Sequence, residues 1–194
     1  MTMHNFLRTN TRQWHDRVDQ AFTQFDLTTL SGYGTFLKVH CRAIERCESD
    51  LADWNVAERF PGWMGAMRMP ALLADLDQLS LSRPPPLNSL PGAASPRAVS
   101  DAELVGMMYV LEGSRLGGRV LAKCVRQSSD ARCRSATAYL NHDGGVSWQS
   151  FLGRLSALRF SNQQMNAALA AAIEIFGQFD RALTDSAENL EEFE

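Results

Sequence analysis

Four glycines in one predicted helix are the first residues whose spacing suggests chemistry. Gly113, Gly117 and Gly118 interrupt the otherwise helical stretch YVLEGSRLGGRVLAK at 109–123. Each glycine inside a helix costs about 1 kcal/mol relative to alanine. Gly106 lies seven residues before Gly113, and Gly117 lies four after it, so these three share one helix face. Bare backbone there serves either close helix packing or the approach of a flat ligand, and periodicity alone favours packing.

A histidine on the first predicted helix favours the ligand. The inward stripe of that helix consists of Leu7, Thr11, Trp14, Val18 and Phe22, and His15 lies on the same side. A lone histidine on an apolar face is most often a core residue, but Arg8 and Arg12 precede this one by seven and three residues. An imidazole beside two guanidinium groups suits a flat, metal-centred dianion. The imidazole would ligate iron, and the arginines would meet carboxylates.

These two stretches together resemble the haem oxygenase family. LRTNTRQWH (7–15) resembles the family's N-terminal haem-ligand motif, and 109–123 resembles its distal helix, whose glycine-rich kink covers the opposite haem face. The motifs occur in the family's order, and the resemblance covers most of the chain. Within the family, the chain most resembles the short bacterial forms, including those that supply biliverdin to bacterial phytochromes.

The resemblance implies an activity and a set of haem-binding residues. The family cleaves haem, which is both cofactor and substrate, with O₂ and reducing equivalents, giving biliverdin, CO and free iron. The chain would sandwich haem between its first helix and its distal helix, with His15 as the proximal ligand of the haem iron. The implied haem-binding residues are His15, Arg8, Arg12, Gly113, Gly117 and Gly118.

The chain departs from the family pattern at one position. The animal-type motif has an aspartate after the first distal glycine, where it orders water near the iron, and this sequence has Ser114. Many bacterial forms also carry serine there. The resemblance therefore implies Gly113, Ser114 and Gly117 as the catalytic residues of the distal side, with the water network arranged through other groups. Arg115 is expected to face solvent.

Two alternatives to a haem oxygenase stay open at this point. One is a non-catalytic haem-binding or haem-trafficking protein on the same fold, and the other is a related helical protein that binds a different small molecule. His40 is expected at the core or its boundary, and Glu45, Glu48 and Asp50 are expected on a charged outer face.

The composition bounds the partners and the compartment. The net charge of −3 predicts no general attraction to nucleic acid or anionic membranes, and no stretch approaches the length of a membrane span. Without a secretory signal or a CxxC pair, the four cysteines are expected to be reduced and the location cytoplasmic. The implied partners are haem, O₂, an electron donor such as ferredoxin or a reductase, and a bacterial phytochrome that receives biliverdin.

The elements that must position these residues are all helical. The sequence predicts one all-α domain over 1–194. The resemblance implies a haem-oxygenase-like fold for it, with haem between the first helix and a glycine-kinked distal helix. Helices are expected at 3–23, 33–54, 68–80, 100–126, 147–158 and 162–185, and Ser100 to Glu103 forms a capping box. The segment 82–100 reads as an irregular proline-rich loop, and 186–194 as a frayed acidic tail.

Overall fold

The computed structural model describes residues 2–61, 67–87, 98–144 and 147–191, which form helices and no strand. This confirms the all-α prediction. The helices are α1 (Met3–Asn10), α2 (Arg12–Phe22), α3 (Leu30–Asp53), α4 (Val56–Arg59), α5 (Met69–Gln78), α6 (Asp101–Val125), α7 (Ala131–Ser135), α8 (Ala138–Asn141), α9 (Trp148–Ala157) and α10 (Asn162–Glu191). Within these ranges, no helix combines the length and hydropathy needed to cross a bilayer.

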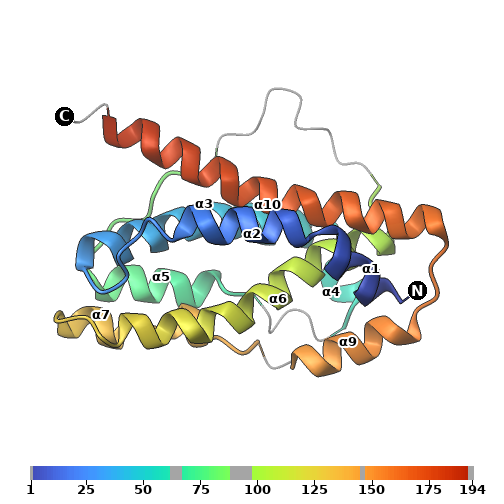
Figure 1. The fold of residues 1–194 in the computed structure, drawn as a ribbon, viewed down its shortest axis with the longest axis horizontal. Helices are drawn as coiled ribbons and strands as arrows, with labels where there is room; N and C mark the ends of the chain where they lie inside the picture. Colours follow the sequence, from blue (N-terminus) through green and yellow to red (C-terminus); the bar gives the residue numbers. More distant parts are fainter. Residues whose placement is uncertain (1, 62–66, 88–97, 145–146, 192–194) are drawn as a thin grey trace.

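The long helices α3, α6 and α10 carry most of the core. In Figure 1, α10 runs along the upper side, α2 and α3 lie beneath it, and α5, α6, α7 and α9 form the lower part. The largest fully buried side chains come from α1, α3, α5, α6 and the residue that follows α5; they are Leu7, Tyr33, Phe36, Leu37, Val39, Ile44, Leu51, Leu72, Leu76, Leu79, Leu104 and Met108. This apolar contact holds α3 and α6 in fixed positions relative to each other.

The N-terminal helix differs from the prediction of one helix over 3–23. It is broken at Thr11, whose backbone N–H and hydroxyl both donate to the carbonyl oxygen of Leu7, each at 2.8 Å. A threonine hydroxyl that binds the preceding turn in this way competes with regular helix bonding and bends the chain. The helix that carries His15 therefore starts anew at Arg12.

The remaining boundaries follow local capping signals. Ser100 and Glu103 form the predicted capping box at the start of α6, while Thr29 caps α3 by accepting from the N–H of Gly32. Helix α10 continues to Glu191 rather than ending near 185. The fraying predicted for 186–194 stays a prediction, and residues 192–194 lie outside the described ranges. Of the predicted loop 82–100, residues 82–87 are irregular and 88–97 lie outside the described residues. The short helices α4, α7 and α8 were not predicted.

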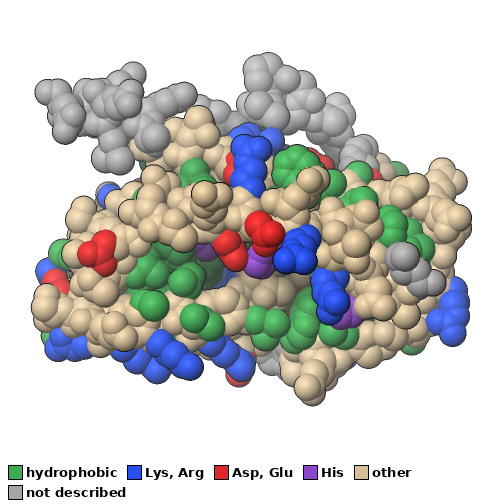
Figure 2. Space-filling view, viewed as in Figure 1, with side chains coloured by type: hydrophobic (Ala, Val, Ile, Leu, Met, Phe, Trp, Pro, Cys, Tyr) green, Lys and Arg blue, Asp and Glu red, His purple; other side chains and the backbone are tan. Residues whose placement is uncertain are grey.

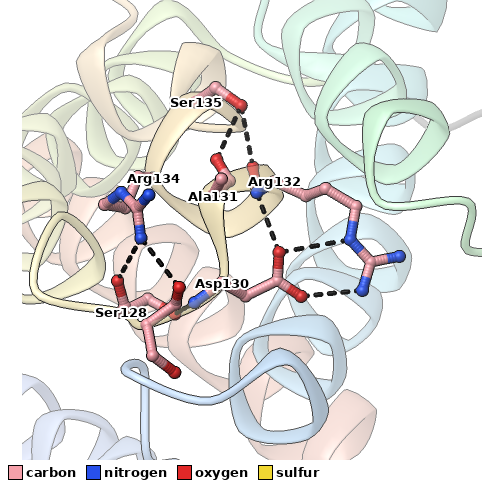
Figure 3. Close-up of polar contacts among 7 residues, drawn as sticks. Ser128, Asp130, Ala131, Arg132, Arg134 and Ser135 are labelled. Carbon is pink, nitrogen blue, oxygen red and sulfur yellow. Dashed lines mark hydrogen bonds and ion pairs between the residues drawn. The ribbon is translucent and has the colours of Figure 1, made fainter.

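A polar turn joins α6 to α7. Figure 3 shows Asp130 accepting from the N–H of Arg132 at 2.8 Å and pairing with the same residue's guanidinium at 2.7 Å. Arg134 donates from Nη1 to the carbonyl oxygens of Ser128 and Ser129 at 2.7 and 2.9 Å. These bonds satisfy backbone groups that the end of one helix and the start of the next leave open.

The glycines of α6 divide into two kinds. A methyl group on Gly106 would lie 1.9 Å from the carbonyl oxygen of Ala168 in α10, and one on Gly118 would lie 2.9 Å from that of Leu140 in α8. At these two positions only a bare backbone fits. A methyl on Gly117 would meet nothing within 4 Å, and one on Gly113 only the Trp148 ring at 3.7 Å. Helix packing therefore explains Gly106 and Gly118, but not Gly113 and Gly117.

The same substitution should have opposite effects at the two kinds of glycine. Gly106→Ala should lower the free energy of unfolding of the ligand-free protein by about 1–3 kcal/mol, because α6 and α10 must separate. Gly117→Ala should leave that free energy unchanged or raise it by up to about 1 kcal/mol, because alanine favours the helix and has room. Urea denaturation followed by circular dichroism measures both, and equal stabilities would contradict the division.

Candidate active site

A cavity of about 680 Å³ opens between α2 and α6. Figure 2 shows this face hollowed, with hydrophobic side chains inside and charged and histidine side chains along the upper edge. The volume suits a ligand of a few dozen atoms. All the site residues predicted from the sequence line this one cavity; they are Arg8, Arg12, His15, Gly113, Ser114, Gly117 and Gly118.

Helix α2 forms one wall of the cavity and has no buried residue of its own. Its apolar stripe includes Val18 and Phe22, which both line the cavity. The side chain of His15 is 59% exposed, and its Nδ1 lies 3.2 Å from Oδ2 of Asp19. Because Nδ1 faces a carboxylate, Nε2 is the nitrogen left for a metal. Asp19 was not singled out from the sequence, although its spacing of four from His15 on a helix could have indicated it.

The opposite wall is the bare face of α6. Gly113 and Gly117 line the cavity with open space or an aromatic ring beside them, and Leu116 next to them is 49% exposed. Gly118 also lines the cavity, but its missing side chain is explained by the packing of α8. A flat ligand between the walls would meet an imidazole on one side and backbone on the other.

Arg68 is a cavity residue that sequence reasoning missed. It directly precedes α5 and is only 4% exposed. Its Nη1 donates to Oγ of Ser114 at 2.9 Å, whereas its Nη2 has no hydrogen-bond partner among the described residues. The Ser114 hydroxyl itself donates to the carbonyl oxygen of Leu111 at 2.9 Å. Arg68, rather than Ser114, therefore has a donor left for a ligand in the cavity.

A second polar pair lies on the same side. His40 Nδ1 and the Tyr139 hydroxyl are 2.6 Å apart, and both residues line the cavity. Burial, followed by the nearby Arg68 charge, lowers the pKa of His40 to about 3, so its imidazole is neutral. Burial raises the pKa of Tyr139 to about 12. His40 is thus a wall residue of the cavity, consistent with the predicted boundary position.

Two charged residues occupy places opposite to those predicted. The Arg115 side chain is 9% exposed rather than solvent-facing, with Nη2 3.1 Å from Glu112 Oε1 and Nη1 3.2 Å from His142 Nδ1. Glu48 is 4% exposed rather than part of a charged outer face. Arg115 lines the cavity and Glu48 does not, and each has a hydrogen-bonded or oppositely charged neighbour.

The two arginines of the N-terminal motif lie at the cavity mouth. Arg12 is 81% exposed on its side chain, with its Nε 3.7 Å from Asp16 Oδ2. Arg8 is exposed and has no ion pair among the described residues. Burial raises the pKa of Tyr109, and the nearby Arg8 charge only partly offsets that rise. The mouth can therefore offer cations to an anionic edge of a ligand.

The described residues hold no cluster of three or more histidine, cysteine or acidic side chains able to bind a bare metal ion, and all four cysteines are free. A metal at His15 would have to arrive with its other ligands. An apolar slot, one imidazole and cations at the mouth suit a planar metal complex with acidic substituents.

Comparisons with known proteins show what this chain is similar to in sequence and in fold. A family model described as heme oxygenase matches residues 91–185. A heme oxygenase of Xanthomonas campestris pv. campestris (strain 8004) is 31% identical over 156 residues, covering 80% of this chain and 90% of that protein. Among solved structures, the NO- and CO-bound heme oxygenase from Neisseria meningitidis has a TM-score of 0.73 at 20% identity, covering 96% of this chain and 92% of that one. The heme oxygenase from Leptospira interrogans has a TM-score of 0.61 at 17% identity, covering 95% and 100%.

The lowered pKa of His40 gives a testable dependence of stability on pH. Because the folded protein disfavours the protonated imidazole, the unfolded chain takes up the proton first as pH falls below 6.5. The free energy of unfolding should therefore not depend on the protonation of His40 above that pH. Below it, this free energy should fall by up to about 1.4 kcal/mol per pH unit. His40→Gln should flatten this slope in urea denaturation of the ligand-free protein. Parallel curves for both proteins would show that His40 is protonated normally.

Proposed function

This chain belongs to the haem oxygenase family, and from that premise we propose that haem binds in the cavity between α2 and α6 with His15 ligating its iron. Haem oxygenases cleave haem with O₂ and reducing equivalents to biliverdin, CO and free iron, and this chain is such an enzyme. The observation that carries the assignment of the site is the juxtaposition of His15 with the bare backbone of Gly113 and Gly117 across one cavity.

The residues present fit haem. The cavity walls are largely apolar, which suits a porphyrin, and exposed cations lie at the mouth, which suits its propionates. A buried, unpartnered donor, Nη2 of Arg68, lines the same cavity. Such a group is costly unless a ligand or water accepts from it. Arg8 and Arg12 are the proposed propionate partners.

His15 and Asp19 would form the proximal side. The Asp19 carboxylate beside Nδ1 keeps the proton on that nitrogen, so Nε2 has a lone pair available for iron. Both side chains are more than half exposed, and a ligand in the cavity would cover the imidazole. The pair contributes little to folding in the absence of ligand, since exposed ion pairs are worth about 0–1 kcal/mol.

The distal side would combine space with directed donors. When bound, haem supplies the iron that activates O₂ and the ring that is oxidised. Gly113 and Gly117 leave room beside the backbone of α6, and neither presents a side chain that could ligate the iron. Arg68, fixed by Ser114, offers Nη2 to the oxygen side, and Tyr139 and His40 extend the polar wall. A donor in an apolar cavity acts on charge more strongly than in water.

The partners and location predicted from the resemblance stay predictions. They are an electron donor such as ferredoxin or a reductase, a bacterial phytochrome that receives biliverdin, and the cytoplasm. An exposed part of α6 beside the cavity supports a protein donor, because it carries Leu116, Arg119, Val120 and Lys123 without an acidic residue among them. Apolar contact flanked by cations suits an acidic redox protein.

His15→Ala should abolish or sharply reduce bilin formation. With haem added in stoichiometric amount and ascorbate as reductant, the wild-type Soret band should decay and bilin absorption should rise. The absorption spectrum of the variant should show that the wild-type axial ligand is missing. Added imidazole should give the variant a haem absorption spectrum like that of the wild type, because it replaces only the missing ring. Normal spectra and bilin yield in His15→Ala would overturn the assignment of the iron ligand.

Arg68→Gln should separate turnover from binding. The iron ligand and the propionate partners remain, so haem affinity should change little, whereas turnover should fall by about a hundredfold, as for loss of one directed donor. Arg126→Gln is the matched control, since Arg126 is exposed at the C-terminal end of α6 and does not line the cavity. Equal turnover in Arg68→Gln and Arg126→Gln would remove Arg68 from the distal side.

A further inference from the structure

Two buried carboxylates cap helices that are not their own. Glu48 in α3 accepts from the N–H groups of Arg68 and Met69 at the start of α5, one on each oxygen, at 2.5 and 3.2 Å. Asp75 in α5 accepts in the same way from the N–H groups of Ala138 and Tyr139 at the start of α8, at 2.9 and 2.8 Å. Glu48 is 4% exposed and Asp75 is 1% exposed.

Capping alone does not explain these carboxylates. A helix start is ordinarily capped by a serine, threonine, asparagine or aspartate at the N-cap, which stays near the surface. The N-cap residues of α5 and α8, Arg68 and Thr137, make no side-chain cap bond. Burying a carboxylate instead carries a desolvation cost, seen in the raised pKa of both Glu48 and Asp75. Because each carboxylate comes from another helix, it also fixes the start of α5 relative to α3 and the start of α8 relative to α5.

The residues held by the two carboxylates meet at the cavity. Glu48 binds the backbone N–H of Arg68, and Asp75 binds that of Tyr139. The Arg68 guanidinium lies 5.7 Å from the centroid of the Tyr139 ring. From this point, Arg68 reaches Ser114 on α6, and Tyr139 reaches His40 on α3. The contacts thus run from α3 through α5 to α8 and return to α6 and α3.

We propose that Glu48 and Asp75 are positioning residues of the distal side: by binding paired backbone N–H groups, they set where Arg68 and Tyr139 point into the cavity. The inference rests on the proposed function of Arg68. Neither carboxylate lines the cavity, so each acts through the residue whose backbone it holds. Glu48 governs mainly the guanidinium, and Asp75 governs mainly the hydroxyl and its bond to His40.

The C–O stretching frequency of the ferrous carbonyl complex tests this directly. A positive donor near the oxygen lowers that frequency, because it favours transfer of iron electrons into the C–O antibonding orbital. Glu48→Gln and Asp75→Asn keep the size of each side chain but turn an N–H group toward one of the two backbone donors. Both variants should shift the band to higher frequency or split it, in the direction given by Arg68→Gln. Asp53→Asn and Asp77→Asn, exposed on the same two helices, should leave it unchanged.

The outcomes separate this inference from the proposed function. If Arg68→Gln shifts the band while Glu48→Gln and Asp75→Asn bind haem and leave it in place, the carboxylates are only helix caps and this inference fails alone. If Arg68→Gln itself leaves the band unchanged, the proposed distal role of Arg68 and this inference both fail. Should the amide variants not fold, Glu48→Asp and Asp75→Glu keep the charge and move the anchor by one methylene. An unshifted band in those variants would equally overturn the inference.

Discussion

The contact between Gly106 and Ala168 is the constraint on which the position of α6 depends. An added methyl would lie 1.9 Å from a backbone oxygen of α10, so the two helices are as close as their backbones allow. Such a contact fixes both the separation and the register of the pair. Because α6 is held at this end, its second half has a defined place across the cavity from α2, with Gly113 and Gly117 facing the space between them.

The two walls of the cavity differ in how far contacts within the protein already cover their residues. Helix α2 has no fully buried residue, and Val18 and Phe22 of its apolar stripe pack only partly against the core where they line the cavity. A ligand bound in the cavity would cover them further and stabilise the folded state. On the distal wall, the polar side chains already contact one another, although Nη2 of Arg68 has no partner among the described residues. Arg68, Tyr139 and His40 are joined by hydrogen bonds and ring contacts, and buried networks of this kind resist rearrangement.

Activity in a haem oxygenase requires that one site hold an iron, admit O₂ and direct its reaction to the ring. In the proposed site these tasks fall on separate elements. The imidazole comes from α2, the open space from α6, and the directed donor from the residue that precedes α5. The donor is buried at 4% exposure, whereas the imidazole is more than half exposed. In the proposed site, the donor of the oxygen side is therefore held in place before haem binds, and the imidazole is left accessible to the incoming ring.

The sequence by itself determined the long helices α3, α6 and α10 and the two motifs that line facing walls of the cavity. It did not determine the break at Thr11 or the short helices. Periodicity and local caps such as Ser100 with Glu103 act within a few residues, and the motifs around His15 and Gly113 are local too. It did not determine the burial of Arg68, Glu48 and Arg115, and the last two were expected at the surface. From the local sequence, a charged residue in a helix is predicted to face solvent. The groups that make its burial possible come from elsewhere in the chain, so the local pattern does not contain them. Only the tertiary structure brings α3, α5, α6 and α8 together, and with them the partners that those charges need.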